Sequence, residues 1–82
     1  MSYEKVERAK KTIIGTKQTV KAIRAGIVTE VIIARDAEER IIAPAMVEAG
    51  LHGILVTHVD SKERLGEVCG IQVGAAVVAI TV

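Results

Sequence analysis

Two lysines follow a glycine in the segment IIGTKQTVKAIRAG (residues 13–26), where a short apolar run gives way to a helical pattern. Lys17, Lys21 and Arg24 recur at helical spacing, so all three share one face of the expected helix. A helix N-terminus already carries the positive end of the helix dipole, and lysines there add like charge to like. A bound polyanion would remove this repulsion, whereas Lys17 and Lys21 taken alone are also consistent with solvated surface cations.

The charge of the whole chain is divided unequally along its length. Residues 1–24 contain seven basic and two acidic residues, a net charge of +5, whereas residues 25–82 contain four basic and eight acidic residues, a net charge of −4. Such segregation favours a polyanionic partner on one face of the protein. A solvated, lysine-rich surface without a partner is the alternative interpretation.

The residue types that could carry catalysis or bind a metal do not form a recognisable pattern. His52 and His58 have no partner at metal-ligand spacing, and Cys69 is expected to be a small buried hydrophobic residue rather than a nucleophile. Ser61 is expected to be a helix cap, and it lies outside any nucleophile elbow. The glycines in GTKQ and GIQVG match neither a phosphate-binding loop nor a dinucleotide fingerprint. We therefore predict no enzyme activity, no catalytic residues, no metal site and no cofactor.

The length and composition indicate one small domain, which we place over residues 1–82. Half of the residues are apolar, but Tyr3 is the single aromatic residue, so the core must consist of Ile, Val, Leu and Ala. No apolar run reaches the roughly 18 residues needed to span a membrane. The charged N-terminal segment MSYEKVERAKK lacks a signal-peptide core. These features predict a cytoplasmic protein without a membrane segment.

The elements that must position the lysines alternate between helices and strands. We predict helices over residues 3–9, 17–25, 37–49 and 61–69, and strands over residues 12–15, 28–34, 54–59 and 76–82. The second strand ends in VIIA, which is apolar on both faces and therefore indicates a central strand covered by helices on each side. The alternation predicts an α/β fold with its sheet between helices.

Three helix boundaries have local signals. Thr16 is expected to be the N-cap of the second helix, and Asp60 and Glu63 form a capping-box pattern at the start of the last helix. Pro44 lies inside the third predicted helix. It either kinks that helix or marks its true start near Ala43, because proline is tolerated at the first helical position.

Two motifs, GTKQTVKAI (residues 15–23) and SKERLGEVCGIQVGAAVVAI (residues 61–80), resemble the ribosomal-protein superfamily that binds kink-turn RNA. Within that superfamily the chain is most similar to the small bacterial YbxF-type proteins. The resemblance covers essentially the whole chain. It implies a three-layer α/β/α sandwich with a central mixed sheet of about four strands. It also implies a single kink-turn RNA-binding domain, whose RNA is a duplex sharply bent beside tandem sheared G·A pairs.

The resemblance also implies which residues contact RNA. Gly15 and Lys21 match the family signature, whereas Lys17 and Gln18 replace its asparagine and glutamate. In the second family element Gln72 replaces glutamate, and a glycine replaces proline. The complete set of expected RNA-binding residues is Gly15, Thr16, Lys17, Gln18, Lys21, Arg35, Lys62, Ile71, Gln72, Val73 and Gly74.

The residue types in these two segments suit a folded RNA. Free N–H groups at a helix start bind phosphate, and the Gln72 amide can hydrogen-bond a base edge while Ile71 and Val73 pack on exposed bases. The near absence of aromatic residues disfavours single-strand binding, which needs stacking platforms, but not recognition of a folded RNA by shape. This interpretation requires the helix start near Gly15 and the turn around Gln72 to lie side by side.

The expected partner is a structured RNA containing a kink-turn, from the ribosome or elsewhere, bound by a monomer. Two alternatives remain open at this point. One is a protein–protein interaction module without specific RNA affinity, in which Ile71 and Val73 contact the partner. The other is a small-molecule enzyme that uses Cys69 or His58.

Overall fold

The computed structural model describes residues 2–82, so Met1, the first residue of the predicted domain, lies outside the described residues. The elements in chain order are α1 (Ser2–Arg8), β1 (Thr12–Ile14), α2 (Thr16–Arg24), β2 (Val28–Ala34), α3 (Glu39–Leu51), β3 (Leu55–Val59), α4 (Lys62–Val68) and β4 (Val77–Thr81). Each predicted helix and strand is present, with ends that differ from the prediction by at most two residues.

The four strands form one mixed sheet in the order β1-β4-β2-β3. β2 and β3 are parallel, and β4 runs antiparallel to both of its neighbours, β1 and β2. The side chains of residues 31–34 in β2 are fully buried, since this strand lies inside the sheet and is covered on both faces. The prediction of a central strand at VIIA is confirmed.

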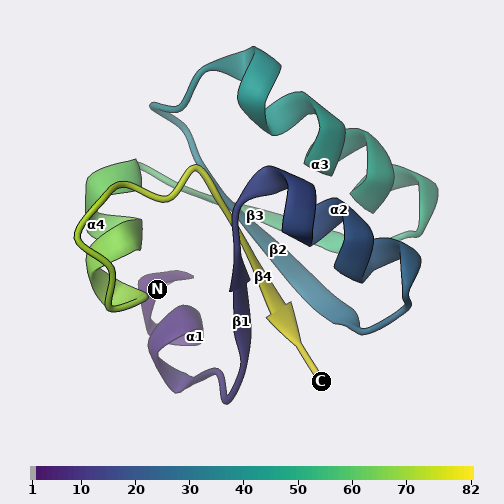
Figure 1. The fold of residues 1–82 in the computed structure, drawn as a ribbon, viewed down its shortest axis with the longest axis horizontal. Coiled ribbons are helices and arrows are strands. Elements are labelled where there is room, and N and C mark those ends of the chain that lie inside the picture. The colour runs from purple at the N-terminus through teal and green to yellow at the C-terminus, as the bar shows by residue number, and fades with distance from the viewer. Residues whose placement is uncertain (1) are drawn as a thin grey trace.

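Helices cover both faces of the sheet in pairs, as Figure 1 shows. Because side chains alternate along a strand, Val31 and Ile33 of β2 pack in the layer that contains α2 and α3. Ile32 and Ala34 of the same strand point to the opposite face and pack with α1 and α4. The predicted three-layer α/β/α sandwich is therefore confirmed.

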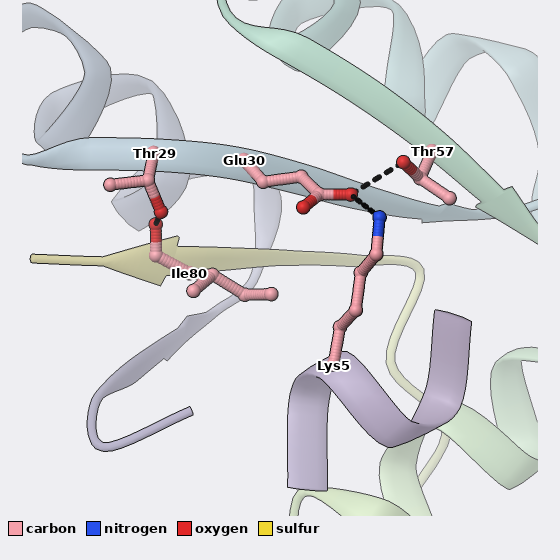
Figure 2. Close-up of polar contacts among 5 residues, drawn as sticks. All are labelled: Lys5, Thr29, Glu30, Thr57 and Ile80. Carbon is pink, nitrogen blue, oxygen red and sulfur yellow. Dashed lines mark hydrogen bonds and ion pairs between the residues drawn. The ribbon is translucent and has the colours of Figure 1, made fainter. Parts of the chain in front are cut away.

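Polar contacts attach α1 to the sheet, as Figure 2 shows. The Lys5 ammonium lies 3.1 Å from a carboxylate oxygen of Glu30 in β2, and the Thr57 hydroxyl of β3 donates to the same oxygen. The Glu30 side chain is only 13% exposed, so this pair is better shielded from solvent than a surface ion pair. Beside it the pairing of β2 with β4 shifts register, and the Thr29 hydroxyl donates to the Ile80 carbonyl.

Tyr3 attaches the start of α1 to the turn between β3 and α4. Its hydroxyl donates to the Asp60 carboxylate and accepts from the Ser61 N–H, while the Arg64 guanidinium lies 4.9 Å from the ring centroid. The hydrogen bond from Tyr3 lowers the pKa of Asp60 below its ordinary value. The side chain of Asp60 is thus engaged by α1.

The N-cap predictions for Thr16 and Asp60 are wrong. Gly15 is the N-cap residue of α2, and the Thr16 hydroxyl donates instead to the Ile41 carbonyl of α3 at 2.8 Å. Ser61 caps α4 by accepting from the Arg64 N–H, so the Asp60–Glu63 capping box does not form. In both cases a partner distant in sequence engages the side chain that was expected to cap.

The start of α3 decides whether Pro44 lies inside that helix or at its first turn. That helix begins at Glu39 and contains Pro44 in its interior, so the alternative of a start near Ala43 is excluded. Proline has no N–H to donate to the carbonyl of Arg40 four residues earlier. Arg40 is exposed, so solvent can satisfy that carbonyl.

Candidate nucleic-acid interface

All the predicted site residues except Lys21, which lies farther along α2, are in loops or helix starts at one end of the strands. β1, β2 and β3 end there and β4 begins there, as the pairs Ile14↔Val78, Ile33↔Val77 and Ala34↔Val59 show. The segments that meet at this end are residues 15–18, 35–36, 60–62 and 71–76, which we call the strand-end edge. Since β1 and β4 are neighbours, the first and last of these segments lie next to each other.

Gly15 connects β1 to α2 and contacts the start of β4 directly. Its N–H donates to the Val77 carbonyl at 2.9 Å, and its φ of 104° lies in the region that favours glycine. The first helical hydrogen bond runs from the Thr19 N–H to the Gly15 carbonyl. The N–H groups of residues 16–18 precede that bond and are available to an anion.

Lys17 and Lys21 are exposed, and neither forms an ion pair with another residue in the range 2–82. Arg24 differs, because its guanidinium lies 2.8 Å from a carboxylate oxygen of Glu48 in α3. The hydrogen bond from Arg24 lowers the pKa of Glu48. Of the three cations predicted to share a helix face, two therefore remain available to a ligand.

The loop over residues 71–76 is held at both ends by backbone hydrogen bonds. The Ile71 N–H donates to the Gly66 carbonyl of α4, and the Ala75 N–H donates to the Lys62 carbonyl. The Ala76 carbonyl accepts from Ala34 at the end of β2. The middle of the loop, residues 72–74, is exposed. In Figure 1 this loop passes beside the start of α2.

The two apolar residues of this loop differ in exposure. Val73 is 71% exposed and can contact a ligand. Ile71 is half-buried and packs against the core between the sheet and the layer of α1 and α4. The structure thus places Ile71 as an anchor of the loop, with Val73 as its exposed apolar side chain.

Lys62 lies beside the loop, whereas the Arg35 side chain lines a hollow next to residues of α1. A Cβ atom at Gly74 would lie 3.2 Å from the Lys62 Cγ, so the lysine stem packs along the loop backbone. The Arg35 N–H donates to Val59 of β3, the strand farthest from β1. The Arg35 side chain lines a hollow in which the carboxylates of Glu4, Glu7 and Asp60 outnumber the guanidinium groups of Arg35 and Arg64, so the hollow favours a phosphate less than the start of α2 does.

Sequence reasoning missed two residues that shape this edge. Gly66 lies inside α4, where a Cβ atom would overlap with the Val73 carbonyl oxygen and lie 3.1 Å from its carbonyl carbon. A glycine within a helical pattern was the available signal for such a close approach. Asp36 accepts a hydrogen bond from the Lys62 N–H at 2.9 Å. Nothing in the local sequence indicated that contact.

The two residues considered for catalysis, Cys69 and His58, have different surroundings. Burial raises the pKa of the half-buried Cys69 thiol, which disfavours the reactive thiolate. His58 lines the same hollow as Arg35. Residues 2–82 contain no group of three His, Cys, Asp or Glu side chains that could hold a metal ion. None of the helices in this range has the length and apolar character needed to cross a membrane.

Comparison with known proteins identifies the family. The profile of the ribosomal protein L7Ae/L30e/S12e/Gadd45 family matches residues 2–82. An RNA-binding protein of Geobacillus sp. (strain WCH70) is 55% identical over 80 residues, and the RNA-binding protein YbxF of Geobacillus stearothermophilus is 54% identical. Each alignment covers 98% of both chains. These matches confirm the resemblance that the two motifs indicated.

Solved structures agree on the fold. The 15.5kD RNA binding protein of Giardia lamblia superposes with a TM-score of 0.85 at 23% identity, covering 98% of this chain and 68% of the other. A protein of unknown function from Bacillus halodurans superposes with a TM-score of 0.84 at 28% identity, covering 98% and 80%. These likenesses show the fold, and the profile match and the sequence relatives show that the chain belongs to the ribosomal protein L7Ae/L30e/S12e/Gadd45 family.

Proposed function

We propose that this protein binds kink-turn RNA and stabilises its bent conformation without catalysing a reaction. One observation carries the proposal: Gly15, the N-cap residue of α2, donates to the carbonyl of Val77, the residue that directly follows the loop over residues 71–76, so the start of α2 lies next to the end of that loop. The first segment offers cations and free N–H groups, and the second offers an amide and an apolar side chain. Relatives that are named RNA-binding proteins support a polynucleotide as the ligand.

The α2 side of the edge is suited to the phosphates of the RNA. The N–H groups of residues 16–18 point out of the helix start, and the ammonium groups of Lys17 and Lys21 are free of ion pairs within the described chain. Lys62 adds a third cation from the start of α4. Converging phosphate groups at a sharp bend repel one another, and these cations would offset that repulsion.

The loop side is suited to exposed bases. The Gln72 amide is both donor and acceptor and can bond a base edge, while Val73 is exposed enough to pack against a base. Lys17 and Gln18 stand where the family signature has asparagine and glutamate, so base recognition shifts toward amide and phosphate contacts. Arg35 lies outside the proposed contact because three carboxylates share its hollow.

The expected mechanism is a shift in population. A free kink-turn RNA exchanges between extended and bent forms, and a protein that binds the bent form more tightly moves the equilibrium by its difference in affinity. One copy of the chain carries both halves of the edge, so a monomer suffices. Ribosomal RNA is a target that fits the family, and the cytoplasm is where such a target would be met.

Kink-turn RNA is therefore expected to bind more tightly than a control duplex in which Watson–Crick pairs replace the G·A pairs. The affinities can be measured by gel shift at one fixed salt concentration. We expect a difference of at least tenfold, or about 1.4 kcal/mol. With four to six phosphate contacts, the slope of log K against log salt should lie near −3 to −5. Equal affinity for the two RNAs would contradict specific recognition and leave only general electrostatic attachment.

A further inference from the structure

Asp36 places a carboxylate on the strand-end edge. Its negative charge is unfavourable for the binding of a polyanion. It follows β2 by two positions and is exposed. At this edge its charge opposes the cations of Lys17 and Lys62. Its carboxylate also makes a structural contact, since Oδ1 accepts a hydrogen bond from the Lys62 N–H at 2.9 Å.

That contact fixes the first turn of α4. The first N–H groups of a helix have no carbonyl partner within the helix. In α4 the Ser61 hydroxyl accepts from Arg64 at 3.1 Å, and Asp36 accepts from Lys62. Two different side chains therefore hold the start of α4, and one of them comes from the loop between β2 and α3.

Lys62 in turn holds the loop over residues 71–76. Its carbonyl accepts the Ala75 N–H at 2.9 Å, and its side-chain stem lies against Gly74. The chain of contacts thus runs from Asp36 through Lys62 to Ala75. Gln72 and Val73, the exposed residues of the loop, directly precede the two residues that Lys62 touches.

We propose that Asp36 is a positioning residue, which sets the loop over residues 71–76 for RNA through its hydrogen bond to the Lys62 N–H. The effect on RNA binding rests on the function proposed above, whereas the effect on the position of the loop is independent of that function. The carboxylate contributes one acceptor oxygen at the correct position for the Lys62 N–H, whereas its negative charge weakens the binding of RNA.

Three substitutions at this position separate the geometric role from the charge. Asp36→Asn keeps an acceptor oxygen at the same distance from the backbone and removes the charge. Asp36→Ala removes both the acceptor and the charge. Asp36→Glu keeps the charge but displaces the acceptor by one methylene. Glu63→Ala serves as the control, because it removes a carboxylate from the first turn of the same helix.

Hydrogen exchange of the Ala75 amide in the free protein tests the positioning without RNA. Asp36→Ala and Asp36→Glu should speed this exchange at least tenfold, because local opening exposes the amide. Asp36→Asn and Glu63→Ala should leave it close to the wild-type rate. Unchanged exchange in both Asp36→Ala and Asp36→Glu would overturn the proposal, and Asp36→Glu carries the test alone should Asp36→Ala not fold.

Affinity for kink-turn RNA then tests the consequence. We expect about tenfold weaker binding for Asp36→Ala and Asp36→Glu, and equal or tighter binding for Asp36→Asn and Glu63→Ala, which lose a repulsive charge. Equal tightening by Asp36→Ala and Asp36→Asn would show that Asp36 acts by its charge alone and would overturn the proposal. Failure of the wild type to bind kink-turn RNA would instead contradict the proposed function. The hydrogen-exchange result would still test the position of the loop, because it is measured without RNA.

Discussion

Replacing Lys17 and Lys21 together by alanine is expected to weaken binding of kink-turn RNA roughly 30-fold at about 0.1 M salt, since two charge-assisted contacts of about 1 kcal/mol each are lost. Both ammonium groups are exposed and free of ion pairs within residues 2–82, so their removal costs the fold little. The slope of log K against log salt should become shallower by about 2. Fluorescence titration over a range of salt concentrations measures both quantities.

The matched control is the double substitution Lys10→Ala and Lys11→Ala, which removes the same charge from the other end of the sheet. The Lys11 carbonyl accepts from Thr81 at the end of β4, whereas α2 starts beside Val77 at its beginning. A five-residue strand spans about 17 Å, which exceeds the Debye length of about 10 Å at 0.1 M salt. The control should change affinity less than threefold. Equal losses for the two double variants would show that only net charge matters.

Gly66→Ala is expected to lower the free energy of unfolding by about 1–3 kcal/mol and to weaken kink-turn RNA binding at least tenfold. The new Cβ would overlap with the Val73 carbonyl oxygen, which belongs to the backbone and cannot rotate away like a side chain. The loop over residues 71–76 must move away from α4, and Val73 and Gln72 move with it. Urea unfolding and RNA titration report the two effects.

Gly50→Ala in α3 is the control for Gly66→Ala. It is also a helical glycine, but a Cβ atom there would have no neighbour within 4 Å. Alanine is favoured over glycine in a helix by up to about 1 kcal/mol, so Gly50→Ala should stabilise the protein and leave RNA binding unchanged. RNA affinity at the wild-type level in Gly66→Ala would mean that the loop does not take part in binding.

The fold could be predicted from the sequence because its signals are local and mutually consistent. Apolar residues on both faces of VIIA require a covered strand, and the structure buries residues 31–34 completely. Helices and strands alternate along the chain, and glycines end several of them. For a short chain this order leaves few arrangements other than helices on both faces of a sheet.

Of the expected helix caps, Ser61 is confirmed, whereas Thr16 and Asp60 are wrong because distant parts of the chain engage their side chains. Thr16 donates to Ile41, and Asp60 accepts from Tyr3, a residue 57 positions earlier. A local pattern shows which side chain is able to cap but not whether a long-range partner competes for it. Ser61 caps α4 because its hydroxyl oxygen accepts from the Arg64 N–H, and within residues 2–82 no distant donor competes for that oxygen.

For the candidate site, the resemblance to kink-turn-binding proteins named the segments, and the structure adds the burial and the contacts of each residue. The burial of Ile71 depends on its packing against the core beside α4, and the surroundings of Arg35 depend on where α1 lies. Neither fact follows from spacing along the chain. The contact from Asp36 to Lys62 joins two loops that are 26 residues apart, and no periodic pattern marks it.

The central claim is that one continuous edge, from the start of α2 to the loop before β4, holds the bent RNA. An NMR titration of the 15N-labelled protein with kink-turn RNA tests it most directly. We predict the largest amide shifts at residues 15–18 and 72–75, with small shifts in α1 and β3. Large shifts at Tyr3, Arg35 and Arg64, which line the hollow beside α1, with residues 15–18 and 72–75 unchanged, would contradict the claim.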